Sequence, residues 1–234
     1  MSPSKKMARI AGALYLLAIL AGVFSLRYVP SKIIVWDNPD KTFRNIIEQE
    51  KLFRLGIIAG IFGYTAFFIL PMVLYSLLHV VNKSLAIGML ALAVVSIPFS
   101  IGNLLYKVNV LTMIEKKAWL KPMDSDLPAQ VLLNLHFYNN GILIASVFWG
   151  LWLFPFGLLV FRSGFLPKML GVLLMAGCFA YLINFLGEFL SPQYSAMDIS
   201  KWVTLPASLG ELGICLWLLS VGVKPSPDKT SLKL

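Results

Sequence analysis

The chain has 234 residues, of which 58% are hydrophobic, 13% aromatic and only 13% charged. Soluble globular proteins carry about 25% charged residues, so this composition excludes a water-soluble enzyme, a disordered chain and a collagen-like protein. The 20 lysine and arginine residues exceed the 11 aspartate and glutamate residues, which gives a net charge of +9. In so apolar a chain this excess is typical of helix ends that meet anionic lipid headgroups, so we expect membrane lipids as partners and no nucleic acid.

Six apolar stretches are each long enough to cross the hydrocarbon core of a bilayer, which requires about 20 helical residues. They predict an all-α, multi-pass membrane protein with a single six-helix transmembrane bundle over residues 1–223 and a disordered polar tail over 224–234. Prolines inside four stretches should kink these helices, namely Pro71, Pro98, Pro155 and Pro206. The expected helices span 9–26, 55–78, 85–114, 131–161, 165–190 and 202–223.

The connections between the expected helices alternate in length, which makes one face of the bundle bulky. The long loops at 27–54 and 116–130 and a moderate loop at 191–201 share this face, and tight turns at 79–84 and 162–164 form the other.

The first helix and the loop after it carry the signals for orientation. The lysines and arginines near the helix ends divide almost evenly between the two faces. Lys5, Lys6 and Arg9 flank the first helix, which usually dominates, and they favour both termini in the cytoplasm. No small-residue cleavage motif follows this helix, which favours a retained span over a signal peptide. Phe43 and Ile46–Ile47 lie among charged residues in the first loop, a pattern that predicts a short interfacial helix.

Polar residues inside the predicted spans are the strongest functional evidence, because they are costly in hydrocarbon and usually face a bundle interior or a water-filled cavity. Four helices each carry a row of such residues at helical spacing. The rows are Ser96, Ser100, Asn103 and Lys107; His136, Asn139 and Asn140; Tyr181, Asn184 and Glu188; and Thr204, Ser208 and Glu211.

The direction of each helix places most of these residues in the half of the membrane nearest the long loops. We therefore predict a polar, water-accessible cavity there, in which Lys107 and Glu211 neutralise one another. The alternative is a structural role, in which the polar groups only satisfy each other. The candidate ligand-binding residues are Asn103, Lys107, His136, Asn139, Asn140, Asn184, Glu188 and Glu211.

No metal or cofactor is expected. A zinc site needs three or four ligands, and the second histidine, His79, is predicted on the face opposite His136, which also argues against a haem held by two histidines. Cys178 and Cys215 lie inside apolar runs and are interpreted as packing residues. The glycines at 56, 60 and 63 indicate close helix packing rather than a phosphate loop. The aromatic segment 148–156 favours packing and interfacial anchoring, with a groove for an apolar ligand as the alternative.

The leading functional hypothesis is a non-enzymatic bundle that binds or moves a small amphiphilic or lipid-like molecule through the polar half of the bundle. The second hypothesis is an intramembrane lipid-modifying enzyme that uses His136 as a base, oriented by Glu211 or Glu188. A third is an accessory or assembly subunit of a membrane complex.

Short sequence motifs, referred to below as phrases, are spread along nearly the whole chain. They are RIAGALY at Arg9–Tyr15, Asn45–Ile46, LFRLG at Leu52–Gly56, Leu74–Tyr75, VNKSL at Val81–Leu85, Leu135–His136, FWGLWLFPFG at Phe148–Gly157, RSGFLPK at Arg162–Lys168, GVLL at Gly171–Leu174, GEL at Gly210–Leu212 and LWLL at Leu216–Leu219. In these phrases the chain resembles a bacterial integral-membrane family known as domain of unknown function 4386. The resemblance implies six transmembrane helices in the bacterial inner (plasma) membrane, and it brings no established activity.

Overall fold

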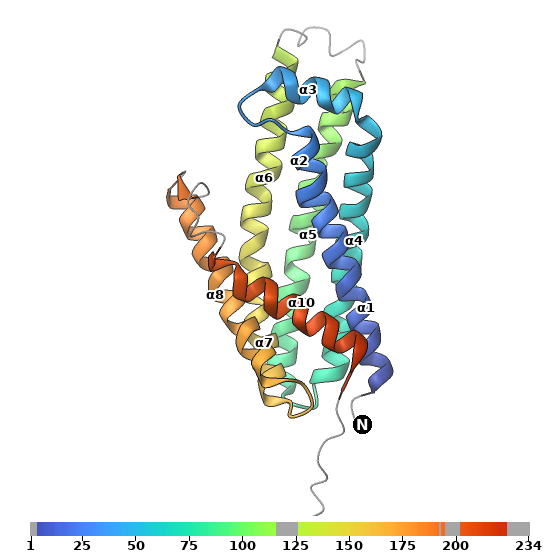
Figure 1. Ribbon diagram of the computed structural model, residues 1–234, viewed down its shortest axis with the longest axis vertical. Coiled ribbons are helices and arrows are strands. Elements are labelled where there is room, and N and C mark those ends of the chain that lie inside the picture. Colours follow the sequence, from blue (N-terminus) through green and yellow to red (C-terminus); the bar gives the residue numbers. More distant parts are fainter. Residues whose placement is uncertain (1–3, 116–125, 192, 195–201, 224–234) are drawn as a thin grey trace, which may run out of the picture. The chain divides into compact units, whose positions relative to one another are not determined.

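The computed structural model describes residues 4–115, 126–191, 193–194 and 202–223, and every regular element within these ranges is helical. Within these residues, five helices are long and apolar enough to cross a membrane, and one further apolar helix is shorter (Figure 1). The prediction of an all-α, polytopic membrane protein is confirmed. The predicted tail at 224–234 and much of the loops at 116–130 and 191–201 lie outside the described residues. The five long spans are Lys5–Ile33, Glu50–Leu78, Lys83–Ile114, Leu127–Arg162 and Lys168–Leu190, and the shorter helix is Leu205–Ser220.

The chain divides into two compact units. The first unit comprises residues 1–16, 69–94 and 146–234, and the second comprises 17–68 and 95–145. The division falls within four helices, which are α1 (Lys5–Gly22), α4 (Glu50–Leu78), α5 (Lys83–Ile114) and α6 (Leu127–Leu151).

The first span is longer than predicted. It continues from α1 through a π-helical segment, η1 (Val23–Tyr28), into α2 (Val29–Ile33), so that helix replaces the start of the expected loop. Pro30 lies in the first turn of α2 and does not end the span.

The predicted short helix of the first loop is present as α3 (Pro39–Glu48). Asn38 caps its start, since Oδ1 of Asn38 accepts a hydrogen bond from the Lys41 amide over 2.9 Å. Asn45 in turn donates to the carbonyl of Ile33 over 2.9 Å and so satisfies the end of α2. Figure 1 shows α3 lying crosswise at the start of α4.

The core of the second unit gathers side chains from five helices. Ile46 of α3 is fully buried and packs with residues of α2, α4, α5 and α6. The glycines at 56, 60 and 63 bring α4 close to the first span, because a Cβ on each would lie 3.0 Å from a side-chain atom of Val29, Ser25 and Ala21, respectively. This confirms the interpretation of these glycines as helix-packing residues.

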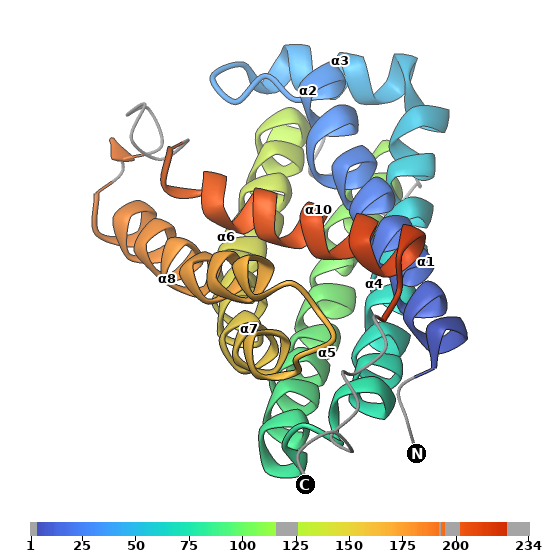
Figure 2. The ribbon, with the colours of Figure 1, turned by 60° about the horizontal axis from the view of Figure 1, so that its bottom comes forward.

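The first unit contains α7 (Leu153–Arg162), α8 (Lys168–Leu190) and α10 (Leu205–Ser220). Figures 1 and 2 show α10 running beside α8, and these two helices are in contact. The turn between α7 and α8 includes Gly164, whose φ of +73° is accessible to glycine at little cost.

The interior prolines act in different ways. Helices α4 and α5 continue through Pro71 and Pro98. Helix α6 gives way to α7 at Trp152, close before Pro155. Pro206 was expected to kink a helix over 202–223, but it lies in the first turn of α10, where proline has no helical hydrogen bond to lose.

Candidate functional site

The polar row on α5 lies on the buried face of its helix. Lys107 is 1% exposed and Asn103 is 7% exposed, while Ser96 and Ser100 are fully buried. This confirms that the row faces the protein interior, as its spacing predicted.

Lys107 binds a backbone carbonyl that the helix itself cannot satisfy. At the end of η1 the amide of Val29 donates to the carbonyl of Phe24, five residues back, and so bypasses Ser25. The next amide in this register would come from residue 30, which is proline and has no N–H. The Ser25 carbonyl is left without a helical donor, and Nζ of Lys107 donates to it over 3.3 Å.

The other surroundings of the ammonium are aromatic and neutral. Nζ of Lys107 lies 4.0 Å from the centroid of the Tyr138 ring, a cation–π contact. The hydroxyl of Tyr138 lies close to those of Tyr64 and Ser25. No carboxylate among the described residues forms an ion pair with Lys107.

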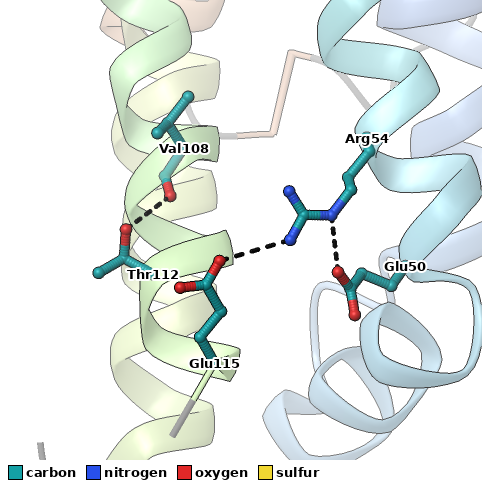
Figure 3. A network of polar contacts seen from close by, with 5 residues as sticks. All are labelled: Glu50, Arg54, Val108, Thr112 and Glu115. Carbon is teal, nitrogen blue, oxygen red and sulfur yellow. Dashed lines mark hydrogen bonds and ion pairs between the residues drawn. The ribbon is translucent and has the colours of Figure 1, made fainter. Parts of the chain in front are cut away.

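An ion-pair network joins α4 to α5 at the loop end of the second unit (Figure 3). Nε of Arg54 donates to Glu50 over 2.6 Å, and Nη2 of Arg54 lies 3.5 Å from Oε1 of Glu115. The side chain of Arg54 is 43% exposed and those of both glutamates are 42% exposed. Surface ion pairs contribute about 0 to 1 kcal/mol, so this network adds little to the stability of the fold.

A groove with a volume of about 450 Å³ lies between α5 and α6 within the second unit. The rings of Tyr106 and Phe137 pack at a centroid distance of 5.5 Å on its wall. Nδ2 of Asn103 donates to the Tyr138 carbonyl over 2.7 Å, whereas the side chain of Asn140 makes no hydrogen bond to any described residue. The lining residues are Pro98, Phe99, Gly102, Asn103, Tyr106, Phe137, Asn140, Gly141 and Ile144.

The polar row on α6 does not face the interior. His136, Asn139 and Asn140 are exposed, because the opposite face of α6 carries apolar residues such as Leu132 and Leu135, which are drawn into the core. The expectation of an inward-facing row was therefore wrong for this helix. The ring of His136 packs against that of Trp36 at a centroid distance of 4.8 Å, and among the described residues no carboxylate or hydroxyl is hydrogen-bonded to His136.

In the first unit, the carboxylate of Glu211 on α10 is held by two tyrosines. The hydroxyl of Tyr15 on α1 donates to Oε2 over 3.0 Å, and that of Tyr181 on α8 donates to Oε1 over 3.1 Å. Tyr15 also packs against Trp152 at a ring distance of 6.1 Å. The RIAGALY, FWGLWLFPFG and GEL phrases meet around this carboxylate.

Lys107 and Glu211 belong to different units, and each has partners within its own. The predicted ion pair between them therefore finds no support, and their location in one half of the membrane stays a prediction. Two other candidates lie on α8 in the first unit: Asn184 accepts a hydrogen bond from Tyr194 over 2.7 Å, and Glu188 is exposed.

Sequence reasoning missed several partners of the buried charges. Tyr15 and Tyr138 stand inside apolar stretches and resemble packing residues, yet a buried tyrosine needs a partner for its hydroxyl, and this requirement could have flagged both. Pro30, five residues after Ser25, was the sequence signal for a carbonyl without a helical donor.

Comparisons with known proteins identify a family and nothing more specific. A family model described as a domain of unknown function, DUF4386, matches residues 10–222, which include parts of both units. No curated protein and no solved structure matches the chain. Within the described residues, no group of three or more histidine, cysteine, aspartate or glutamate side chains is arranged to hold a metal ion.

Proposed function

The chain belongs to the DUF4386 family, and from this premise and the geometry of the second unit we propose that it binds a small amphiphilic or lipid-like molecule in the groove between α5 and α6. One observation carries the proposal: the groove combines aromatic walls with two amide side chains, and it lies on helices apolar enough to span a membrane. Its volume of about 450 Å³ also lies in the range of about 300 to 1,000 Å³ that ligand pockets occupy.

The walls of the groove favour the hydrocarbon part of a lipid. Phe99 is 54% exposed and Ile144 is 48% exposed, and both line the groove. On a membrane-spanning helix an exposed apolar surface meets acyl chains instead of water. This surface therefore favours the binding of an acyl chain or a comparable apolar tail.

The polar lining favours an uncharged head group. None of the nine lining residues carries a charge, so a charged head would enter without a counter-ion. Asn140 offers both a donor and an acceptor to a hydroxyl or an ester. A bound head group would also relieve the cost of an amide that otherwise meets hydrocarbon.

The test is photolabelling of the purified protein in lipid nanodiscs with a diacylglycerol that carries a diazirine in one acyl chain. We expect the label on peptides that contain Phe99, Tyr106 or Phe137. Asn140→Leu should lower the labelling about fivefold, because one hydrogen bond of about 1 kcal/mol is lost. Asn139→Leu is the matched control, since Asn139 is an exposed neighbour that does not line the groove. Labelling spread evenly over all helices, or equal losses in both variants, would refute the proposal.

We also propose that the protein lies in a bacterial inner (plasma) membrane with both termini in the cytoplasm. Lys5, Lys6 and Arg9 are exposed at the start of α1, which supports this orientation. A green fluorescent protein fused to the carboxyl terminus should fluoresce, and an alkaline phosphatase fused there should be inactive. The reverse pattern would contradict the orientation.

A further inference from the structure

A second polar site, independent of the groove, surrounds Glu211 in the first unit. Glu211 is the only charged residue of α10, whose remaining residues are mostly apolar. The side chain is partly buried, and both carboxylate oxygens accept hydrogen bonds, from Tyr15 over 3.0 Å and from Tyr181 over 3.1 Å. A carboxylate in such a place is costly unless something offsets its charge.

No cation offsets it among the described residues. The titratable groups that contact Glu211 are Tyr15 from α1 and Tyr181 from α8, and Cys215, one turn further along α10, lies near Tyr15. All three are ordinarily uncharged at neutral pH. The thiol of Cys215 donates a hydrogen bond to the carbonyl of Gly12 over 3.5 Å. Every lysine and arginine that the structure describes in the first unit is exposed, and none of them forms an ion pair with Glu211.

Two tyrosines can serve as partners of a carboxyl group in both protonation states, because a tyrosine hydroxyl both donates and accepts hydrogen bonds. An ionised carboxylate can accept from both hydroxyls, whose oxygens lie 3.0 Å and 3.1 Å from those of Glu211. After protonation, the acid can donate to one tyrosine oxygen while its other oxygen still accepts from the second hydroxyl. An arginine or lysine partner would suit only the ionised form, because neither side chain accepts a hydrogen bond.

We propose that Glu211 is a proton-binding site, which takes up and releases one proton while Tyr15 and Tyr181 remain its partners in both forms. The proton exchanges between water and the carboxylate, and no other group changes its charge.

Infrared difference spectroscopy of the full-length protein in lipid nanodiscs, titrated from about pH 4 to about pH 10, tests the proposal. A protonated carboxylic acid has a C=O stretching band that a carboxylate lacks. We expect a reversible band that shifts when glutamate is labelled with ¹³C and that is absent from Glu211→Gln. Glu188→Gln, which changes an exposed carboxyl group on α8, should keep the band. The isotope shift assigns the band to a glutamate in the unaltered protein, even if one variant folds poorly.

Variants of the two tyrosines distinguish a proton-binding site from a carboxylate with a purely structural role. Tyr15→Phe and Tyr181→Phe each remove one hydrogen bond to the ionised form, so the band should appear at a pH about one unit higher, which is a tenfold change in proton affinity. The proposal is overturned if Glu211 keeps one protonation state over the whole range. A band that neither tyrosine variant moves would overturn it as well.

Discussion

A single proline, Pro30, explains why the ammonium group of Lys107 is buried against the backbone. Pro30 cannot donate to the carbonyl that faces it in the π-helical register, so a side-chain donor must reach the Ser25 carbonyl, and Lys107 does so over 3.3 Å. The ring of Tyr138 adds a cation–π contact in place of a carboxylate. Lys107 is thereby held by neutral groups, an arrangement that differs from the ion pair expected from the sequence.

This explanation predicts coupling between residues 30 and 107. Pro30→Ala restores an N–H that can donate to Ser25, so it should stabilise the Lys107→Met variant more than it stabilises the unchanged protein. The expected difference is about 1 to 2 kcal/mol, the cost of a buried carbonyl without a donor. Unfolding of the four proteins in detergent micelles measures it. Strictly additive effects would show that the Ser25 carbonyl does not depend on Lys107.

The residues of the site could be predicted only in part. The burial of Asn103 and Lys107 followed from their spacing on α5. Their partners could not be predicted, because the π-helical segment shifts the hydrogen-bond register by one residue and leaves no periodic signature in the sequence. The polarity of His136 predicted that it would face the interior of the protein. It is exposed instead, because the apolar face of α6 packs into the core.

At the scale of elements, small residues set the distance between helices. A Cβ on Gly171 of α8 would lie 2.7 Å from the Gly157 carbonyl oxygen and 2.7 Å from the Phe161 amide nitrogen on α7. Such close approach of backbones is typical of membrane helices. In lipid the hydrophobic effect does not drive helices together, so van der Waals packing contributes more to their association. Packing by the glycines at 56, 60 and 63 could be predicted from their spacing. The extension of the first span to Ile33 could not, since Arg27 and Lys32 end the apolar run before the helix ends.

Gly171→Ala should destabilise the protein by about 1 to 3 kcal/mol, because the new methyl group collides with backbone atoms that cannot move aside. Gly88→Ala on α5 is the matched control, since a Cβ there meets no atom within 4 Å. The control should be neutral or stabilising by up to about 1 kcal/mol, as expected for alanine in a helix. Thermal unfolding in detergent compares the two variants, and equal midpoints would refute the close packing of α7 on α8.

At the scale of the whole molecule, the two units carry polar sites of different chemistry. The second unit holds a buried ammonium and an amide-lined groove, and the first holds a carboxylate between two tyrosines. The all-α membrane class could be predicted from composition and span length alone. The division into two units could not, because it falls inside four helices and no linker or change of composition marks it.

Filling the groove with a larger side chain shows whether a lipid-like molecule binds there. Gly102 lines the groove and a Cβ there meets no atom within 4 Å, so Gly102→Leu should occupy the ligand's space without disturbing its neighbours. Gly88→Leu places the same side chain at an equally open position of α5 outside the groove. With the diazirine diacylglycerol, we expect Gly102→Leu to lose labelling of the groove peptides about tenfold, equivalent to about 1.4 kcal/mol, and Gly88→Leu to keep it. Equal labelling of the two folded variants would show that the ligand does not bind in the groove.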